Sequence, residues 1–153
     1  MTFFIYFRPM FKPGWILSML IFFAVAPAYT QSIIGKWKTI DDETLEAKSI
    51  VEIFAYNGKV YGKIIKLFRG PDEDQDPVCS ECPEDDPRYN KKVLGMEIIK
   101  EMVRDEQAYG GGTILDPKVG KIYRCRLWLE GDNLKVRGYW GPFYRTQTWH
   151  REK

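Results

Sequence analysis

Residues 49–68 read SIVEIFAYNGKVYGKIIKLF and carry the clearest structural signal in the chain. Across Ser49–Tyr56, side chains such as Val51 and Ile53 recur at every second position, which is the period of a β-strand. Asn57-Gly58 follows and is the strongest short-range signal for a hairpin turn. Lys59–Phe68 then returns as a second strand, so the stretch predicts an antiparallel β-hairpin.

Further strands are expected on both sides of this hairpin. They cover Ile33–Ile40 before it and Tyr109–Leu115, Lys121–Glu130, Leu134–Trp140 and Tyr144–Arg151 after it. Short strands joined by tight turns at roughly 8–12-residue spacing are typical of a sandwich or a barrel. Helix-length crossovers, which a parallel sheet needs, are missing. The predicted fold class is therefore all-β and mainly antiparallel.

Two segments between the hairpin and the later strands are expected to differ from this pattern. Residues 70–92 hold four prolines and eight acidic residues, and proline at that density excludes a helix or a central strand. We expect a long exposed loop there, of the kind that is functional or disordered. In Val93–Val103, Leu94, Ile98 and Met102 recur at i, i+4 and i+8, which favours one short helix.

The first 28 residues are expected to be a cleaved signal peptide. Arg8 and Lys12 supply a positive start, Trp15–Val25 is apolar and uncharged, and Ala26-Pro27-Ala28 has the small-x-small form of a cleavage site. The apolar run is shorter than the roughly 20 residues of a spanning helix, which disfavours a membrane anchor. We therefore expect an exported protein, periplasmic or secreted, with a single domain over residues 29–153.

The charge of this mature domain bears on its partners. The formal charge of +2 comes from Arg8 and Lys12, and residues 29–153 carry 21 basic and 21 acidic side chains. A neutral chain has no overall attraction to nucleic acid or to anionic lipid. No later stretch is apolar enough to cross a bilayer. We expect no nucleic-acid partner and no stable membrane span after cleavage.

Several motifs in combination resemble one bacterial family. They are Gly35-Lys36-Trp37, Val60-Tyr61-Gly62-Lys63-Ile64, Cys79-Ser80-Glu81-Cys82, Gly95-Met96-Glu97-Ile98, Ile114-Leu115-Asp116-Pro117 and Arg145-Thr146-Gln147-Thr148-Trp149. Together they resemble the domain-of-unknown-function 2147 family of small exported bacterial proteins, over nearly the whole mature chain. The resemblance implies a small up-and-down β-barrel of the lipocalin or fatty-acid-binding type. It implies no catalytic residues.

The two ends of the mature chain are expected to meet when the barrel closes. Lipocalins carry Gly-x-Trp on the first strand and a late Arg or Lys that packs over this Trp, and Gly35, Trp37 and Arg151 resemble this arrangement. Closing a barrel brings its first and last strands together. We expect Trp37 and Trp149 to plug one end of the core, with Arg151 stacked on a Trp face.

The cysteines leave three interpretations of Cys79-x-x-Cys82 open: a redox pair, half of a zinc site with Cys125 and His150, or a local disulfide. Acidic neighbours raise thiol pKa values and disfavour the reactive thiolate. A structural Cys79–Cys82 disulfide is favoured, and Cys125 is expected to be buried in its strand. The acidic residues 72–76 lack the Gly and Glu that an EF-hand requires. No metal and no cofactor are expected.

The candidate ligand contacts lie on the last three expected strands. They are Arg137 and Gln147, together with Arg124, Arg126 and Tyr139. If Arg137 and Gln147 face inward, they form a polar floor in an aromatic cavity, which suits an amphipathic ligand with an anionic head. If they face outward, they are ordinary surface residues. The pattern does not determine which face is internal, because apolar partners occupy both faces of these strands.

Two functions follow from these patterns. The first is a non-catalytic exported barrel that binds a small amphipathic or apolar molecule in its interior. The alternative is a cell-envelope interaction module with a filled barrel, which docks a protein partner through the residue 70–92 loop. An enzyme is not expected, because no nucleophile–base pair can be named in the chain.

Overall fold

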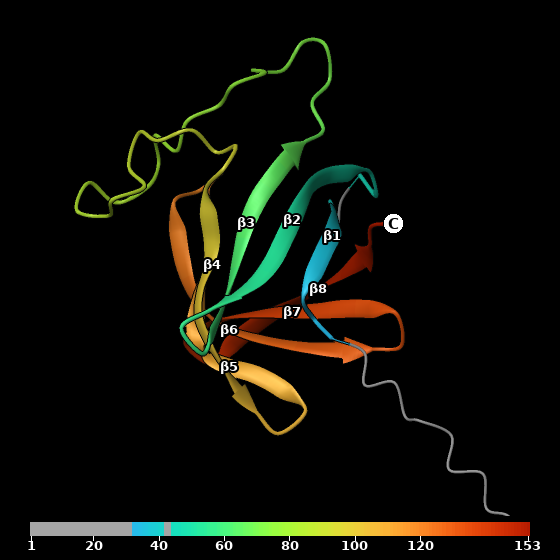
Figure 1. The fold of residues 1–153 in the computed structure, drawn as a ribbon. Coiled ribbons are helices and arrows are strands. Elements are labelled where there is room, and N and C mark those ends of the chain that lie inside the picture. Colours follow the sequence, from blue (N-terminus) through green and yellow to red (C-terminus); the bar gives the residue numbers. More distant parts are fainter. Residues whose placement is uncertain (1–31, 42–43) are drawn as a thin grey trace, which may run out of the picture.

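The computed structural model describes residues 32–41 and 44–153, so the predicted signal peptide lies outside the described residues. In this part of the chain eight strands follow one another: β1 (Gly35–Ile40), β2 (Ala47–Tyr56), β3 (Lys59–Leu67), β4 (Glu97–Asp105), β5 (Ala108–Asp116), β6 (Lys121–Glu130), β7 (Asn133–Trp140) and β8 (Phe143–Arg151). Each strand pairs antiparallel with the next, and β8 pairs with β1 to close a barrel (Figure 1). The predicted all-β, up-and-down barrel is confirmed.

The hairpin turn between β2 and β3 shows why these residues fold as they do. Asn57 and Gly58 have φ values of 48° and 75°, and Tyr56 pairs with Lys59 on either side of them. Two successive positive φ values belong to the type I′ turn, whose twist matches that of the flanking strands. The hairpin predicted from Asn57-Gly58 is therefore present with its expected turn.

The helix expected over Val93–Val103 is wrong, because β4 occupies this region. Ile99 of β4 pairs with Gly62 of β3, whereas Met102 pairs with Val60, so β4 uses three residues where β3 uses two. This irregularity is a β-bulge, and it places two fully buried side chains three positions apart. The described residues contain no helix, and hence none that could span a membrane.

The barrel has two ends that differ in structure. The β1–β2 turn, the long β3–β4 connection, the β5–β6 turn and the β7–β8 turn lie at one end, which we call the loop end (the upper part of Figure 1 shows the first two). The other end, the terminal end, holds the three remaining turns, the start of β1 and the end of β8.

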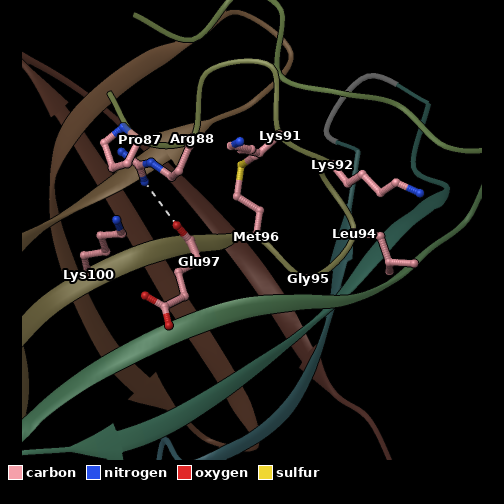
Figure 2. Close-up of a pocket in the computed structure, with 9 residues that line it drawn as sticks. All are labelled: Pro87, Arg88, Lys91, Lys92, Leu94, Gly95, Met96, Glu97 and Lys100. Carbon is pink, nitrogen blue, oxygen red and sulfur yellow. Dashed lines mark hydrogen bonds between the residues drawn. The ribbon is translucent and has the colours of Figure 1, made fainter. Parts of the chain in front are cut away.

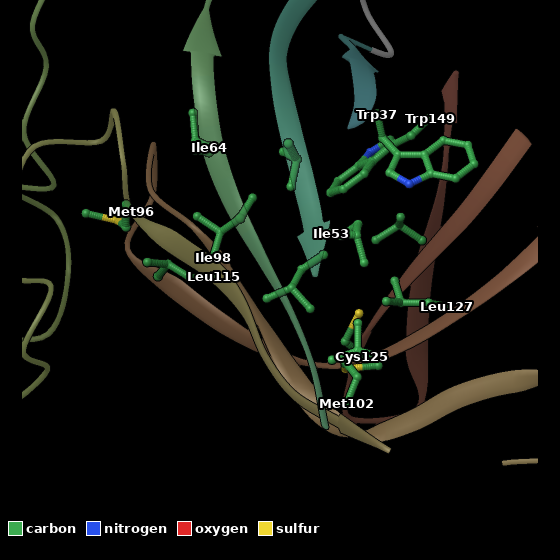
Figure 3. Close-up of a cluster of buried hydrophobic side chains, with 14 of the residues drawn as sticks. Trp37, Ile53, Ile64, Met96, Ile98, Met102, Leu115, Cys125, Leu127 and Trp149 are labelled. Atoms are coloured by element: carbon green, nitrogen blue, oxygen red, sulfur yellow. The ribbon is translucent and has the colours of Figure 1, made fainter. Parts of the chain in front are cut away.

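The interior is densely packed towards the terminal end. Figure 3 shows Trp37 and Trp149 lying next to each other above Ile53 and Leu127. The largest fully buried side chains of the strands are Trp37, Trp149, Ile53, Ile99, Met102, Leu127 and Leu134, together with Leu115 near the loop end. This apolar filling supplies most of the stability that the barrel can gain from burial.

Candidate functional site

The terminal end is closed by a contact between the first and last strands. The Arg151 guanidinium lies 4.2 Å from the centre of the Trp37 ring, and its Nη2 donates to the Ser32 carbonyl at 2.7 Å. Trp37 Nε1 donates to the Ile33 carbonyl, also at 2.7 Å. A Cβ on Gly35 would lie 3.3 Å from Arg151 Nη1, so glycine leaves room for the guanidinium. The expected packing of Arg151 over Trp37 is therefore present.

The expected polar floor of Arg137 and Gln147 does not form, because the two residues lie on opposite faces of the sheet. In the β7–β8 hairpin, buried Leu134 and Val136 pair with Trp149 and Gln147. Side chains of paired residues share a face, so Gln147 faces the interior. Its Oε1 accepts a hydrogen bond from Trp149 Nε1 at 3.1 Å.

Arg137 belongs to the outer face. It pairs with Thr146, and its Nε donates to Thr146 Oγ1 at 2.8 Å. Its guanidinium lies 4.3 Å from the ring centre of Tyr144 and 5.0 Å from that of Trp128. The stacking on two outward rings corrects the placement of Arg137 inside the barrel.

The three other candidate contacts also lie outside. Cys125 is buried on the inner face of β6, so Arg124 and Arg126 on either side of it point outward. Arg124 pairs with Tyr139, which places that ring on the outer face as well. Arg126 Nη2 lies 3.6 Å from Asp105 Oδ2 in an exposed ion pair. Among the five residues, Gln147 is the one that faces the interior.

The inner face opens at the loop end, in a group of residues that we call the mouth. It consists of Ile114, Tyr123, Gly138, Arg145 and Gln147. These residues share the inner face, because Ile114 pairs with Tyr123 and Gly138 pairs with Arg145. Gln147 lies two residues after Arg145 on β8 and therefore points to the same face. Four of them are half-buried and Arg145 is exposed. Side chains inside a closed barrel can contact solvent only through an open end, so the barrel is accessible here.

The mouth combines apolar and polar groups. A Cβ on Gly138 would lie 3.4 Å from Tyr123 Cβ and 3.8 Å from Ile114 Cγ2, so the absent side chain keeps the space beside the Tyr123 ring open. Gln147 supplies an amide, and Arg145 adds a positive charge at the edge. Tyr123, Gly138 and Arg145 were missed in the sequence, although the two-residue turn Gly141-Pro142 would have indicated which residues pair across this hairpin.

The cysteine interpretation is settled in favour of a disulfide between Cys79 and Cys82. Both residues are buried, and Cys79 Sγ lies 3.4 Å from the Pro117 carbonyl oxygen in the β5–β6 turn. Cys125 is separate, on the inner face of β6, where burial raises the pKa of its thiol to about 12. Within residues 32–41 and 44–153, no group of three or more His, Cys, Asp or Glu side chains is arranged to hold a metal ion.

The β3–β4 connection is not simply an exposed loop, which corrects the expectation for residues 70–92. Residues 70–76 are exposed, but Cys79, Cys82 and Val93 are part of the hydrophobic core. The Arg88 side chain is 9% exposed and holds the segment to the barrel. Its Nε and Nη2 donate to the two Asp86 carboxylate oxygens at 2.8 and 2.7 Å, and its Nη1 donates to the Glu97 carbonyl at 3.1 Å.

The described part of the chain forms at least two hollows at its surface. One of about 350 Å³ lies between this connection and β4 and is lined by Arg88, Met96, Glu97 and Lys100 among others (Figure 2). The other, of about 700 Å³, lies beside the β4–β5 turn. Figure 2 shows the hydrogen bond between Arg88 and the Glu97 carbonyl, and both residues line the first hollow, so its shape depends on the Arg88 contacts.

The Asp86–Arg88 pair predicts a pH dependence. Side-chain and backbone hydrogen bonds from Arg88 lower the pKa of Asp86 from an ordinary 3.8 to about 2. Because the folded-state pKa is depressed, the pair stabilises the folded protein fully above pH 4, and this contribution is lost as the pH falls towards 2. We expect Asp86→Asn to have a lower melting temperature than the wild type at pH 6 and the difference to shrink between about pH 4 and 2. A difference in melting temperature that stays constant over that range would show that ionised Asp86 does not stabilise the folded protein through Arg88.

Comparisons with known proteins give two matches. The model of a family described as "Uncharacterized protein conserved in bacteria (DUF2147)" matches residues 35–151. A solved structure, described as "Protein HP1028 from the human pathogen Helicobacter pylori belongs to the lipocalin family", is similar with a TM-score of 0.67 at 23% sequence identity, over 81% of this chain and 85% of that one. At this identity the likeness shows the fold, which is lipocalin-like. No curated protein matches the chain.

Proposed function

The chain belongs to the DUF2147 family of uncharacterised bacterial proteins, and from this premise we propose that it is a non-catalytic binding protein that holds a small amphipathic molecule in the mouth of its barrel. One observation carries the proposal: inner-face side chains of β5 to β8 are partly exposed at the loop end, whereas Leu127, Leu134 and Trp149 further along the same inner face are fully buried or nearly so. An accessible, partly apolar concave surface with a few polar groups is the usual form of a small-molecule site.

The mouth residues suggest the chemistry of the ligand. Tyr123 and Ile114 offer apolar contact, Gln147 offers a hydrogen-bonding amide, and Arg145 offers a charge-assisted hydrogen bond to an anionic head. Below them Trp149, Leu127 and Ile53 fill the barrel. The proposed ligand therefore enters only the outer part of the interior, with its anionic group near Arg145.

The non-catalytic part of the proposal is supported by the state of the reactive groups. The Cys125 thiol is a poor nucleophile because burial raises its pKa to about 12. The His150 imidazole lies on the exposed outer face, where its Nδ1 is 2.8 Å from Asn133 Oδ1. Cys125 pairs with the mouth residue Gly138, but its thiol is buried, and His150 lies on the opposite face of β8 from the mouth residues Arg145 and Gln147.

Export is proposed for the same protein. Disulfides form and persist in oxidising compartments, and the Cys79–Cys82 bridge supports the exported location that residues 1–28 predict. The native mass of the purified protein is the first measurement to make. A mass excess that is lost on denaturation would be a carried ligand, and its value would indicate the class of compound.

The binding site is tested by filling it. We expect Gly138→Leu to reduce binding of the anionic amphipathic probe 1-anilinonaphthalene-8-sulfonate at least tenfold, because the new side chain would occupy the space beside Tyr123. A tenfold loss corresponds to about 1.4 kcal/mol. Arg137→Ala is the control, since Arg137 lies on the outer face of the same strand and its loss should leave probe affinity unchanged.

The outcome of this titration is read together with a thermal unfolding curve for each variant. Equal probe affinity of Gly138→Leu and the wild type, with both proteins folded, would exclude the mouth as the binding site. Arg145→Gln refines the test, because it should lower the affinity for the anionic probe and leave the affinity for an uncharged analogue unchanged.

A second candidate function rests on the β3–β4 connection. Its residues 70–76 are exposed and acidic, while the disulfide and Arg88 fix the rest of the segment to the barrel. An exposed acidic tip on a segment that is fixed to the barrel suits a basic protein partner. Deleting the segment would expose the core around Cys79 and Val93, so point substitutions are the sharper test. The double variant Asp72→Asn, Asp74→Asn should lower the affinity for a basic protein partner and leave the affinity for the fluorescent probe unchanged.

A further inference from the structure

The β7–β8 turn exposes a cluster of large aromatic side chains. Trp140 is 68% exposed, Phe143 66% and Tyr144 61%, and the Trp140 and Phe143 rings lie 6.1 Å apart. Val119 and Ile122 of the neighbouring β5–β6 region are also exposed. We call these five residues the aromatic rim. Clustered large apolar side chains on a protein surface mark an interaction site, whereas single exposed ones are ordinary.

Positive charge surrounds the aromatic rim. At the loop end, residues 117–125 and 137–147 together carry five basic residues and no acidic one, although residues 29–153 as a whole are neutral. Lys121 Nζ lies 5.6 Å from the Trp140 ring centre, and the Arg137 guanidinium lies 4.3 Å from that of Tyr144. The acidic residues near this region lie on its β5–β6 side: Asp116, whose Oδ1 accepts a hydrogen bond from the Lys118 amide, and Glu81 and Glu73 of the β3–β4 connection, which lie next to Gly120 and Lys118.

The cations of this region are available to a partner. Among the described residues, Lys121, Arg124 and Arg137 make no salt bridge. At the terminal end, by contrast, Lys59 is paired with Glu101 at 3.4 Å. Positive charge without a salt bridge therefore lies beside the aromatic rim, and an anionic surface would complement it.

We propose that the aromatic rim docks on the surface of an anionic lipid bilayer. Trp and Tyr prefer the membrane–water interface, where the ring is in an apolar layer and the polar group stays hydrated. Basic residues add attraction to anionic lipids, and stable binding to a membrane surface needs both contributions. Docking would turn the mouth towards the bilayer, because Trp140 and Lys121 lie two residues from the mouth residues Gly138 and Tyr123. The docking does not require a ligand in the mouth.

The test is sedimentation of the purified protein with vesicles of phosphatidylcholine alone and of phosphatidylcholine mixed with phosphatidylglycerol. We expect binding to the mixed vesicles that weakens with added salt, together with a blue shift of tryptophan fluorescence. Trp140→Ser combined with Phe143→Ser should abolish the binding. Lys121→Gln and Arg124→Gln should each weaken it about fivefold.

Matched controls come from the terminal end of the barrel. Tyr56 is 63% exposed in the β2–β3 hairpin, and Lys59 is the basic residue beside it. Tyr56→Ser and Lys59→Gln should bind mixed vesicles as the wild type does. If the wild type does not bind mixed vesicles at low salt, or if the rim variants bind as well as these controls, the proposal is overturned and an acidic protein becomes the candidate occupant of the rim.

Discussion

We expect Trp37→Ala to lower the free energy of unfolding by about 3–5 kcal/mol, the range for large-to-small changes of buried Trp. Trp37 is fully buried where β1 meets β8, and it packs beside Trp149. Truncation would leave a cavity there that the closed barrel cannot easily collapse. The change would also leave the Ile33 carbonyl without its indole donor and Arg151 without the ring on which it stacks.

Chemical denaturation monitored by circular dichroism measures this effect, with Trp140→Ala as the matched control. Trp140 is the same residue type but is 68% exposed, so its truncation should change stability by no more than about 0.5 kcal/mol. If Trp37→Ala and Trp140→Ala lower the free energy of unfolding by similar amounts, Trp37 does not close the barrel in the way its contacts indicate.

The pairing of the chain ends was predictable because it depends on few residues. Gly35-x-Trp37 and Arg151 lie near the two ends of residues 29–153, and closure of an antiparallel barrel with an even number of strands requires its first and last strands to meet. Hairpins with two-residue turns were also predictable, since Asn57-Gly58 specifies both the turn type and the register of β2 and β3.

β4 was not predictable because its bulge disrupts the alternation on which strand assignment depends. Glu101 has a φ of 59° inside the strand, and the buried residues Ile99 and Met102 stand three positions apart. Spacings of three and four are those of a helix face, so a bulged strand and a short helix produce the same apolar pattern. Pairing with both β3 and β5 decides between them, and a single sequence does not contain that information.

The candidate site was half predictable. Gln147 was identified, but it was grouped with Arg137, which the β7–β8 register places on the opposite face. A shift of one residue in register exchanges the two faces of a strand, so a site built from strand residues depends on pairing more than on residue type. The β3–β4 connection was misjudged for a related reason, because acidic and proline-rich composition conceals the packing of Cys79 and Val93 on the barrel.

The glycines of β5 provide the second large effect. We expect Gly112→Ala to destabilise the protein by about 3 kcal/mol, at the upper end of the range for overpacking. A Cβ at Gly112 would overlap the Lys100 carbonyl oxygen and would lie 2.8 Å from the Met102 amide nitrogen. Backbone atoms have no rotamer with which to move aside, so β4 and β5 would have to separate next to the bulge.

Gly110→Ala is the matched control on the same strand. A Cβ at Gly110 would meet no heavy atom within 4 Å, and its φ is not positive. Replacement by Ala restricts the unfolded chain, so Gly110→Ala should be neutral or more stable by about 0.4–1 kcal/mol. Both variants lose the backbone flexibility of glycine, but the clash with β4 arises only in Gly112→Ala. The difference in stability between the two variants therefore measures the cost of the close approach of the strands. Equal melting temperatures for the two variants would mean that β4 and β5 are farther apart at Gly112 than this structure places them. The β4 bulge, which depends on the same strand positions, would then be wrong as well.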